Sequence, residues 1–243
     1  MGNWKRPEEV PFPSIWRTFE RRDADGVARK YWVQDLTPEY EDIFIDNMKK
    51  IFLKDEPVCK YSNFAEDPQA VQDFTDLWRY GFSHKLGIIC LTEDENGKIE
   101  FVGGNMTALS EKGTKGGIED KCKTYQKVLS VFIYVTKKRD IFNELNINEY
   151  LTAFGLFVLP KFRGQGIATE ILKARRELCL AVGIKASATI FTSIISQKNA
   201  RQAGFKDFVE IDYDDLEKIN PMWNFPGITS FTKSIKYMYI QYS

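Results

Sequence analysis

The residues best suited to chemistry in this chain form a turn between an apolar strand and a helix. The run 157–168 reads FVLPKFRGQGIA, and apolar residues at helical spacing follow it. The first backbone N–H groups of a helix have no partner within the helix and lie at the positive end of its dipole, so they bind anions. Gly164 and Gly166 have no Cβ, so the turn can adopt left-handed angles and let a phosphate approach the amides. The segment therefore predicts a phosphate-binding loop.

The order of glycines and basic residues distinguishes the kinds of phosphate loop. A Walker loop ends in Gly-Lys-Ser/Thr and a dinucleotide fingerprint reads Gly-x-Gly-x-x-Gly, and this turn matches neither. Arg163-x-x-Gly166-x-Ala168 instead resembles the acetyl-CoA loop of the GNAT superfamily of N-acetyltransferases. The alternative interpretation is an ordinary strand-to-helix turn with an exposed arginine.

This resemblance implies how acetyl-CoA is bound. The loop would hold the diphosphate, and the strand before it would pair with the pantetheine arm as an added strand does. A backbone N–H near Phe157 or Val158 would stabilise the oxyanion. The residues that the resemblance assigns to the cofactor are Leu156, Phe157, Val158, Arg163, Gly164, Gln165, Gly166, Ile167, Ala168 and Ser196.

The elements after the loop support the resemblance. A helix should follow the loop and end at Gly183, with Ile171 and Leu178 on its apolar face. Its polar residues Glu170, Lys173, Arg175 and Arg176 should turn outward. A strand at 185–192 and a helix at 193–203, closed by Gly204-Phe205, complete the order of the superfamily's cofactor-binding half.

A candidate base lies about 110 residues before the loop. The segment 52–57, FLKDEP, resembles the Phe-x-Lys-Asp-Glu-Pro motif of insect arylalkylamine N-acetyltransferases, in which the glutamate is the general base. The resemblance assigns this role to Glu56. An alkylamine has a pKa near about 10, so roughly one molecule in a thousand is nucleophilic at neutral pH and a base is needed. The alternative is a solvated carboxylate that closes a helix.

Two hydroxyl residues form a second match to the insect family, which has Ser-Ser-x-x-Ser before Gly-Phe. Here Thr192 stands in place of the first serine and Ser196 in place of the last, and the resemblance implies roles in catalysis or in holding the cofactor thiol. A late tyrosine of the superfamily, which protonates the thiolate, is replaced by Ala200. Protonation of the thiolate is therefore left to Ser196 or water, and Ser196 could also serve as a helix N-cap.

Aromatic residues are the candidates for the amine pocket. Phe52, Tyr61 and Phe132 match regions that line the amine site in the insect enzymes, and an aromatic wall suits an arylalkyl group or a cation. Packing in the core is the alternative for each. The segment 222–226 (MWNFP) could cover the site, and the acidic run 212–215 (DYDD) is expected to be a solvated loop.

Composition excludes several other classes. Lysine and arginine number 34, as do aspartate and glutamate, so zero net charge argues against a sequence-independent nucleic-acid binder. The four cysteines form no Cys-x-x-Cys pair and only one histidine exists, so we expect no metal site. No apolar run approaches the roughly 18 residues of a membrane helix. We expect a cytoplasmic monomer with no membrane or nucleic-acid partner.

The resemblance implies an α+β fold with one GNAT domain. Residues 1–28 should form an irregular N-terminal arm, and 29–243 the acetyltransferase domain. The domain should contain a mixed, mostly antiparallel, twisted sheet of about seven strands flanked by helices and splayed between the fourth and fifth strands. The expected function is acetyl-CoA-dependent acetylation of an arylalkylamine by direct attack in a ternary complex. Polyamine or other small-amine acetylation, and a CoA-binding module without turnover, are the alternatives.

Overall fold

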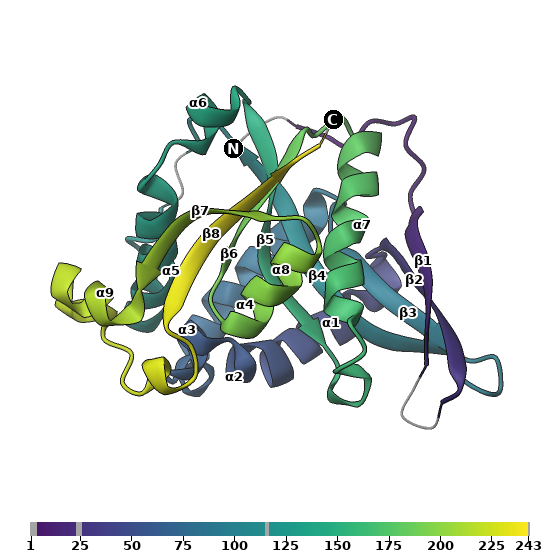
Figure 1. Ribbon diagram of the computed structural model, residues 1–243, viewed down its shortest axis with the longest axis horizontal. Helices are drawn as coiled ribbons and strands as arrows, with labels where there is room; N and C mark the ends of the chain where they lie inside the picture. Colours follow the sequence, from purple (N-terminus) through teal and green to yellow (C-terminus); the bar gives the residue numbers. More distant parts are fainter. Residues whose placement is uncertain (1–3, 23–25, 115–116, 243) are drawn as a thin grey trace.

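Eight strands form one twisted sheet in the computed structural model, which describes residues 4–22, 26–114 and 117–242. The strands are β1 (Ile15–Arg22), β2 (Ala28–Asp35), β3 (Ile88–Glu93), β4 (Ile99–Glu111), β5 (Glu149–Val158), β6 (Ala186–Phe191), β7 (Lys206–Asp212) and β8 (Ser234–Gln241). Their order across the sheet is β1-β2-β3-β4-β5-β6-β8-β7 (Figure 1). Neighbours are antiparallel except for the parallel pair β5 and β6.

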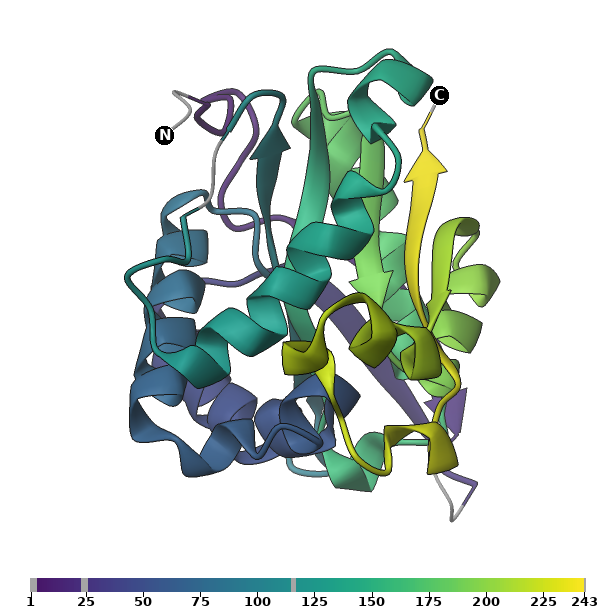
Figure 2. The same cartoon turned by 90° about the vertical axis from the view of Figure 1, so that its left-hand side faces the viewer.

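Helices cover both faces of this sheet. They are α1 (Glu41–Asn47), α2 (Leu53–Asp55), α3 (Pro57–Lys60), α4 (Pro68–Ser83), α5 (Lys123–Lys137), α6 (Ile141–Leu145), α7 (Ile167–Ala181), α8 (Ile194–Gln202) and α9 (Tyr213–Ile219). Helices α7 and α8 lie on one face, and α1 to α5 with α9 cover the other (Figures 1 and 2). A π-helical turn at Met48–Phe52 joins α1 to α2.

Two apolar layers hold the helices onto the sheet. The larger layer lies under α1 to α5 and contains the fully buried Phe44 and Trp78. The second lies under α7, whose Ile171 and Leu178 are fully buried, as their helical spacing predicts. Full burial of one such side chain contributes about 1.5–3 kcal/mol, so both faces of the sheet are stabilised by packing.

The sheet splits between β5 and β6. Strand β5 pairs with β4 at eight positions, but in the described chain it pairs with β6 only where Leu151 faces Ser187. Residues 152–156 remain half-buried even though β5 lies in the middle of the sheet. A strand with an unpaired edge can bind another extended chain through its backbone groups. Beyond Leu151, the edge of β5 that faces β6 is thus without a strand partner in the described chain.

A bulge in β5 lies inside this split. The register between β4 and β5 shifts so that Phe154 and Gly155 face the single residue Met106. Gly155 has a φ of 125°, a conformation that favours glycine. The carbonyl of Phe154 accepts a hydrogen bond from the Trp78 indole at 2.9 Å, and that of Gly155 accepts one from the Asn105 amide at 2.7 Å. Side chains from α4 and β4 therefore hold the bulge in place.

The expected fold class is confirmed, with one strand more than expected. The additional strand β1 lies within residues 1–28, which the sequence indicated to be irregular. Phe19 of β1 stacks on Tyr31 of β2 with ring centroids 5.3 Å apart, and Arg17 is ion-paired to Glu170 of α7. These distant contacts stabilise an edge strand that local propensity does not predict. Because β1 comes first, the split lies between the fifth and sixth strands in chain order.

Two further expectations about side-chain position were wrong. Glu170 and Arg175, predicted to point outward from α7, are 5% and 1% exposed because polar partners surround them. The acidic run at 212–215 is not a loop, because Asp212 ends β7 and Tyr213 begins α9; its three acids are exposed as expected, but Tyr213 is buried. In the segment 222–226, Trp223 and Phe225 are buried in the larger apolar layer.

The described residues contain no helix long and apolar enough to cross a membrane. The same part of the chain has no group of three or more His, Cys, Asp or Glu side chains that could hold a metal ion. Cys59, Cys90, Cys122 and Cys179 are all free cysteines.

Candidate active site

The predicted phosphate loop lies at the open end of the split. Strand β5 ends at Val158, a 3-10 turn follows at Pro160–Phe162, and α7 begins at Ile167. Gly164 and Gly166 have φ values of 81° and 74°, which confirms that the turn needs glycine. A Cβ on Gly164 would meet no atom within 4 Å, so the surface of the turn is open. Unpaired amides at the start of a 15-residue helix fit a diphosphate.

Arg163 connects the loop to the segment that carries the candidate base. Its Nη2 donates to the Asp55 carboxylate at 2.6 Å, and its Nε donates to the Val158 carbonyl at 2.9 Å. Both charged side chains are about half exposed, so the pair itself contributes only about 0–1 kcal/mol to stability. Its structural effect is to place the residue before Glu56 beside the phosphate loop.

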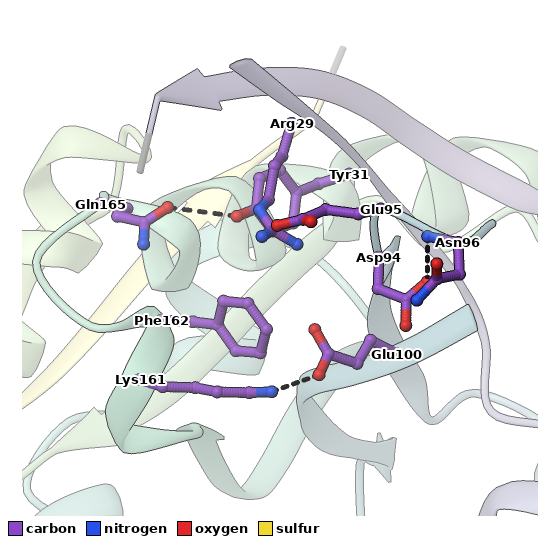
Figure 3. Close-up of a pocket in the computed structure, with 9 residues that line it drawn as sticks. All are labelled: Arg29, Tyr31, Asp94, Glu95, Asn96, Glu100, Lys161, Phe162 and Gln165. Carbon is purple, nitrogen blue, oxygen red and sulfur yellow. Dashed lines mark hydrogen bonds and ion pairs between the residues drawn. The ribbon is translucent and has the colours of Figure 1, made fainter. Parts of the chain in front are cut away.

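Gln165 is held from two sides. Arg21 of β1 donates to its backbone carbonyl at 2.9 Å, and the Tyr31 hydroxyl donates to its side-chain oxygen at 3.2 Å. A cavity of about 350 Å³ lies beside this side chain (Figure 3). Its walls carry charges of both signs, and Lys161 is paired with Glu100. Strands β1 and β2 therefore support the loop from the side of the sheet away from the split.

Glu170 anchors the arginines that support the loop. Its carboxylate, 6% exposed, accepts hydrogen bonds from Arg17 and Arg21, the latter at 2.7 Å. Burial opposes ionisation, but the hydrogen bond and charge of Arg17, together with Lys173, outweigh it and hold the pKa of the Glu170 carboxyl below its ordinary value of 4.5. The ionised carboxylate is thus part of the fold.

We expect Glu170→Gln to lower the free energy of unfolding by about 2 kcal/mol at pH 7, the usual value for hydrogen bonds to a charged group. Because the folded-state pKa is depressed, this contribution is complete above pH 4.5 and is lost as the pH falls through the lower folded-state value. Urea unfolding of both proteins between pH 3 and 7 measures it. The exposed Glu20→Gln is the control. A difference from wild type that stays constant with pH would contradict the assignment.

Glu56 is buried and begins a helix. It is 9% exposed and is the N-cap of α3, where its carboxylate oxygens accept the N–H of Val58 at 3.1 Å and of Cys59 at 2.6 Å. The alternative of a solvated carboxylate at the end of a helix is therefore wrong. The carboxylate is thus fixed in position by the first turn of α3.

Tyr213 and Cys59 link Glu56 to the candidate hydroxyl residues. The Tyr213 hydroxyl donates to the Thr192 carbonyl at 2.8 Å, at the end of β6. Burial raises the pKa of Tyr213 well above its ordinary value, and the charges of Glu56 and Cys59 add to this. Burial and the neighbouring Glu56 charge also raise the pKa of the Cys59 thiol. The buried phenol of Tyr213 thus interacts with both Thr192 and Glu56.

Ser196 lies in the first turn of α8, but it is not the N-cap. That position belongs to Ser193, and the two form a capping box: each side-chain oxygen accepts the backbone N–H of the other, at 3.1 and 3.2 Å. Ser196 is half-buried and Thr192 is buried. Both hydroxyl residues therefore lie at the junction of β6 and α8, beside the split.

The three candidate aromatic residues have different neighbours. The Phe52 ring contacts Phe74 and Trp78 edge-on. It also lies 3.0 Å from where a Cβ on Gly155 would be, so it packs against the bulge. Tyr61 lies against Gly227 in the segment after α9, and Phe132 is half-buried on α5. Of the three, Phe52 is the one in contact with the split.

The chain as a whole is similar to a solved insect protein. The protein assigned as arylalkylamine N-acetyltransferase 7 of the yellow fever mosquito Aedes aegypti is 35% identical to this chain. The alignment covers 98% of this chain and 99% of that one, with a TM-score of 0.92. The chain belongs to the insect arylalkylamine N-acetyltransferase family. It is accordingly an N-acetyltransferase, an acyltransferase with the GNAT fold.

More distant members of the insect N-acetyltransferases share the fold alone. Arylalkylamine N-acetyltransferase 2 of Aedes aegypti is 20% identical over 88% of this chain and 99% of its own, with a TM-score of 0.74. The Drosophila melanogaster polyamine N-acetyltransferase, which forms N-acetylagmatine, is 12% identical over 87% of this chain and 99% of its own, with a TM-score of 0.69. No protein-family model matches this sequence.

Sequence reasoning missed Asp55 and Tyr213 as parts of the site. Asp55 lies within the FLKDEP motif, and an acid next to the candidate base could have suggested a partner for Arg163. Tyr213 gave no such signal, because its run of acidic neighbours is typical of a solvated segment. Only contact between distant segments brings this residue to Glu56.

Proposed function

We propose that this protein acetylates the primary amine of an arylalkylamine with acetyl-CoA, in a ternary complex. The observation that carries the proposal is the split between β5 and β6, which opens onto an unobstructed glycine turn at the start of α7. The loop would bind the diphosphate, and the free edge of β5 would pair with the pantetheine arm. We assign the cofactor contacts to residues 156–158 and 163–168 with Ser196, which lie at the end of β5, in the loop with the start of α7, and in the first turn of α8.

The proposed reaction uses Glu56 as the base. Glu56, directly or through water, takes a proton from the ammonium group of the substrate. The amine nitrogen then forms a bond to the thioester carbon and loses its second proton to water, and the C–S bond breaks with its electron pair left on sulfur. A backbone N–H of β5 near Phe157 would stabilise the oxyanion between these steps.

The cysteines favour direct attack over a covalent acetyl-enzyme. A cysteine is nucleophilic as its thiolate. Burial raises the pKa of all four thiols, and Cys59, which lies beside Glu56, is further disfavoured as a thiolate by the charge of that carboxylate. We therefore assign no covalent role to Cys59, Cys90, Cys122 or Cys179.

An arylalkylamine is favoured over a polyamine by the charges around the site. The acids at the start of α9 could attract a polycation, but Asp215 is paired with Lys218 at 2.8 Å. Asp212 and Asp215 also share their groove with Lys138 and Arg139, so that surface has charges of both signs. The Phe52 ring on the split gives an apolar contact instead, which suits an aryl group.

The test is a panel of amines with acetyl-CoA, monitored by release of the CoA thiol. We expect higher kcat/KM for dopamine, serotonin and tryptamine than for histamine and agmatine. A preference for agmatine would replace the arylalkylamine with a polyamine acceptor. Binding of acetyl-CoA by calorimetry without thiol release from any amine would establish a CoA-binding module without turnover.

A further inference from the structure

Arg175 is a fully buried cation without an anionic partner. It lies on α7 and is 1% exposed. Its Nε donates to Asn105 at 2.9 Å, and its Nη1 donates to the hydroxyls of Ser187 at 3.1 Å and Thr189 at 2.8 Å. All three acceptors are neutral, and among the described residues Arg175 takes part in no salt bridge. Buried charges in proteins are normally paired, so the burial of Arg175 without an anion needs an explanation.

The groups that could neutralise Arg175 are themselves uncharged. Cys179 and Tyr242 are the groups whose negative charge would stabilise the guanidinium. Burial raises the pKa of both above their ordinary values. Burial lowers the pKa of Arg175 to about 10, so it remains protonated at neutral pH. The core between α7 and the sheet therefore contains a fixed positive charge.

This charge lies at the point where the sheet splits. Ser187 is the residue at which β6 still pairs with β5, and its hydroxyl also donates to the Leu151 carbonyl at 3.0 Å. Thr189 follows two residues along β6, on the same face. Arg175 also donates to the side-chain oxygen of Asn105 on β4. The side-chain nitrogen of Asn105 in turn donates to the Gly155 carbonyl in the β5 bulge. The guanidinium thus spans from β4 to β6 across the apex of the split.

The reacting sulfur of a bound thioester would lie near the apex of the split, close to Arg175. A pantetheine arm about 15 Å long corresponds to four or five residues of strand at about 3.3 Å each. Counted back along β5 from Val158, beside the loop, this distance ends at Phe154 and Ala153, next to Gly155 in the bulge. This step rests on the proposed function, because it needs the diphosphate to bind at the loop.

We propose that Arg175 is a positioning residue for acetyl transfer that holds the β5 bulge through Asn105 and places a positive charge where the departing sulfur becomes negative. When the C–N bond forms and the C–S bond breaks, the electron pair remains on sulfur, and an opposite charge nearby stabilises it. The CoA thiolate can then leave without an acid. This accounts for Ala200 at the position where a tyrosine would protonate the sulfur.

The test measures ionisation of the thiol of enzyme-bound CoA. CoA and desulfo-CoA, which lacks the thiol, are titrated by calorimetry between pH 6.5 and 9.5, and ultraviolet absorbance follows the bound thiolate. In wild type the bound thiol should ionise at least about one pH unit below the free thiol, so affinity for CoA rises with pH relative to desulfo-CoA. Arg175→Met should abolish this rise, and Arg175→Lys should keep part of it.

The matched control is Arg176→Met, which removes an exposed arginine from the next position of the same helix and should behave as wild type. Arg175→Gln is a second neutral variant that keeps a donor for Asn105, and it gives the same reading if Arg175→Met does not fold. Equal loss of affinity for both ligands, or an unchanged thiol titration in the neutral variants, would overturn the proposal. If wild type binds neither ligand, the proposed function itself fails.

Discussion

Replacing Glu56 with glutamine should lower kcat/KM for an arylalkylamine by about 10²- to 10⁴-fold at neutral pH, the range that a general base contributes. Without the carboxylate only amine that is already neutral can react. Since an alkylamine has a pKa near about 10, the rate of the variant should rise roughly tenfold per pH unit below that value. Steady-state kinetics from pH 6 to 10 measure both effects.

The fold should tolerate this substitution. A glutamine at position 56 keeps an oxygen that can accept the N–H of Val58 or Cys59, so the cap of α3 is weakened rather than removed. The exposed Glu66→Gln is the matched control, and thermal unfolding of all three proteins separates stability from catalysis. An unchanged kcat/KM at every pH would show that Glu56 is not the base.

Replacing Gly155 with alanine should reduce both stability and activity. At a φ of 125° a side chain is strained, and the new Cβ would lie 2.4 Å from the Met48 methyl and 3.0 Å from the Phe52 ring. Strain and overpacking together should lower the free energy of unfolding by about 2–4 kcal/mol. Displacement of the bulge should also lower kcat, because the bulge borders the split where the proposed binding mode places the thioester.

Gly183→Ala separates the two causes of this loss. Gly183 has a φ of 80°, but a Cβ there would meet no atom within 4 Å, so the substitution carries backbone strain without overpacking. We expect it to cost about 1 kcal/mol and to leave kcat unchanged. Urea unfolding gives the stabilities. Equal losses in the two variants would mean that packing of Met48 and Phe52 against the bulge has no effect.

Local patterns in the sequence predicted the loop turn and the elements that follow it. The helix expected to end at Gly183, the strand at 185–192 and the helix at 193–203 appear as α7, β6 and α8. Hydrophobic period and turn residues act over a few positions of the chain, so they can be read without knowing the fold.

Contacts between distant segments decided what the sequence could not indicate. The prolines of the N-terminal arm and the acidic start of α9 both suggest irregular chain, yet β1 is held by Glu170 and α9 by the burial of Tyr213. Local pattern carries no information about such partners. The helical pattern places Arg175 among the outward-facing residues of its helix. In the structure its side chain points inward and donates hydrogen bonds to Asn105 and Thr189.

The sequence by itself determined the chemistry of the loop, since an unpaired helix start and two glycines attract an anion in any surroundings. It also identified Glu56 as the candidate base through a short motif. Only the tertiary structure determined that Glu56 is a buried N-cap near Thr192 and that Arg175 lies at the apex of the split. The reason is physical: a dipole and a turn are properties of adjacent residues, whereas burial and charge pairing depend on which distant segments exclude water together.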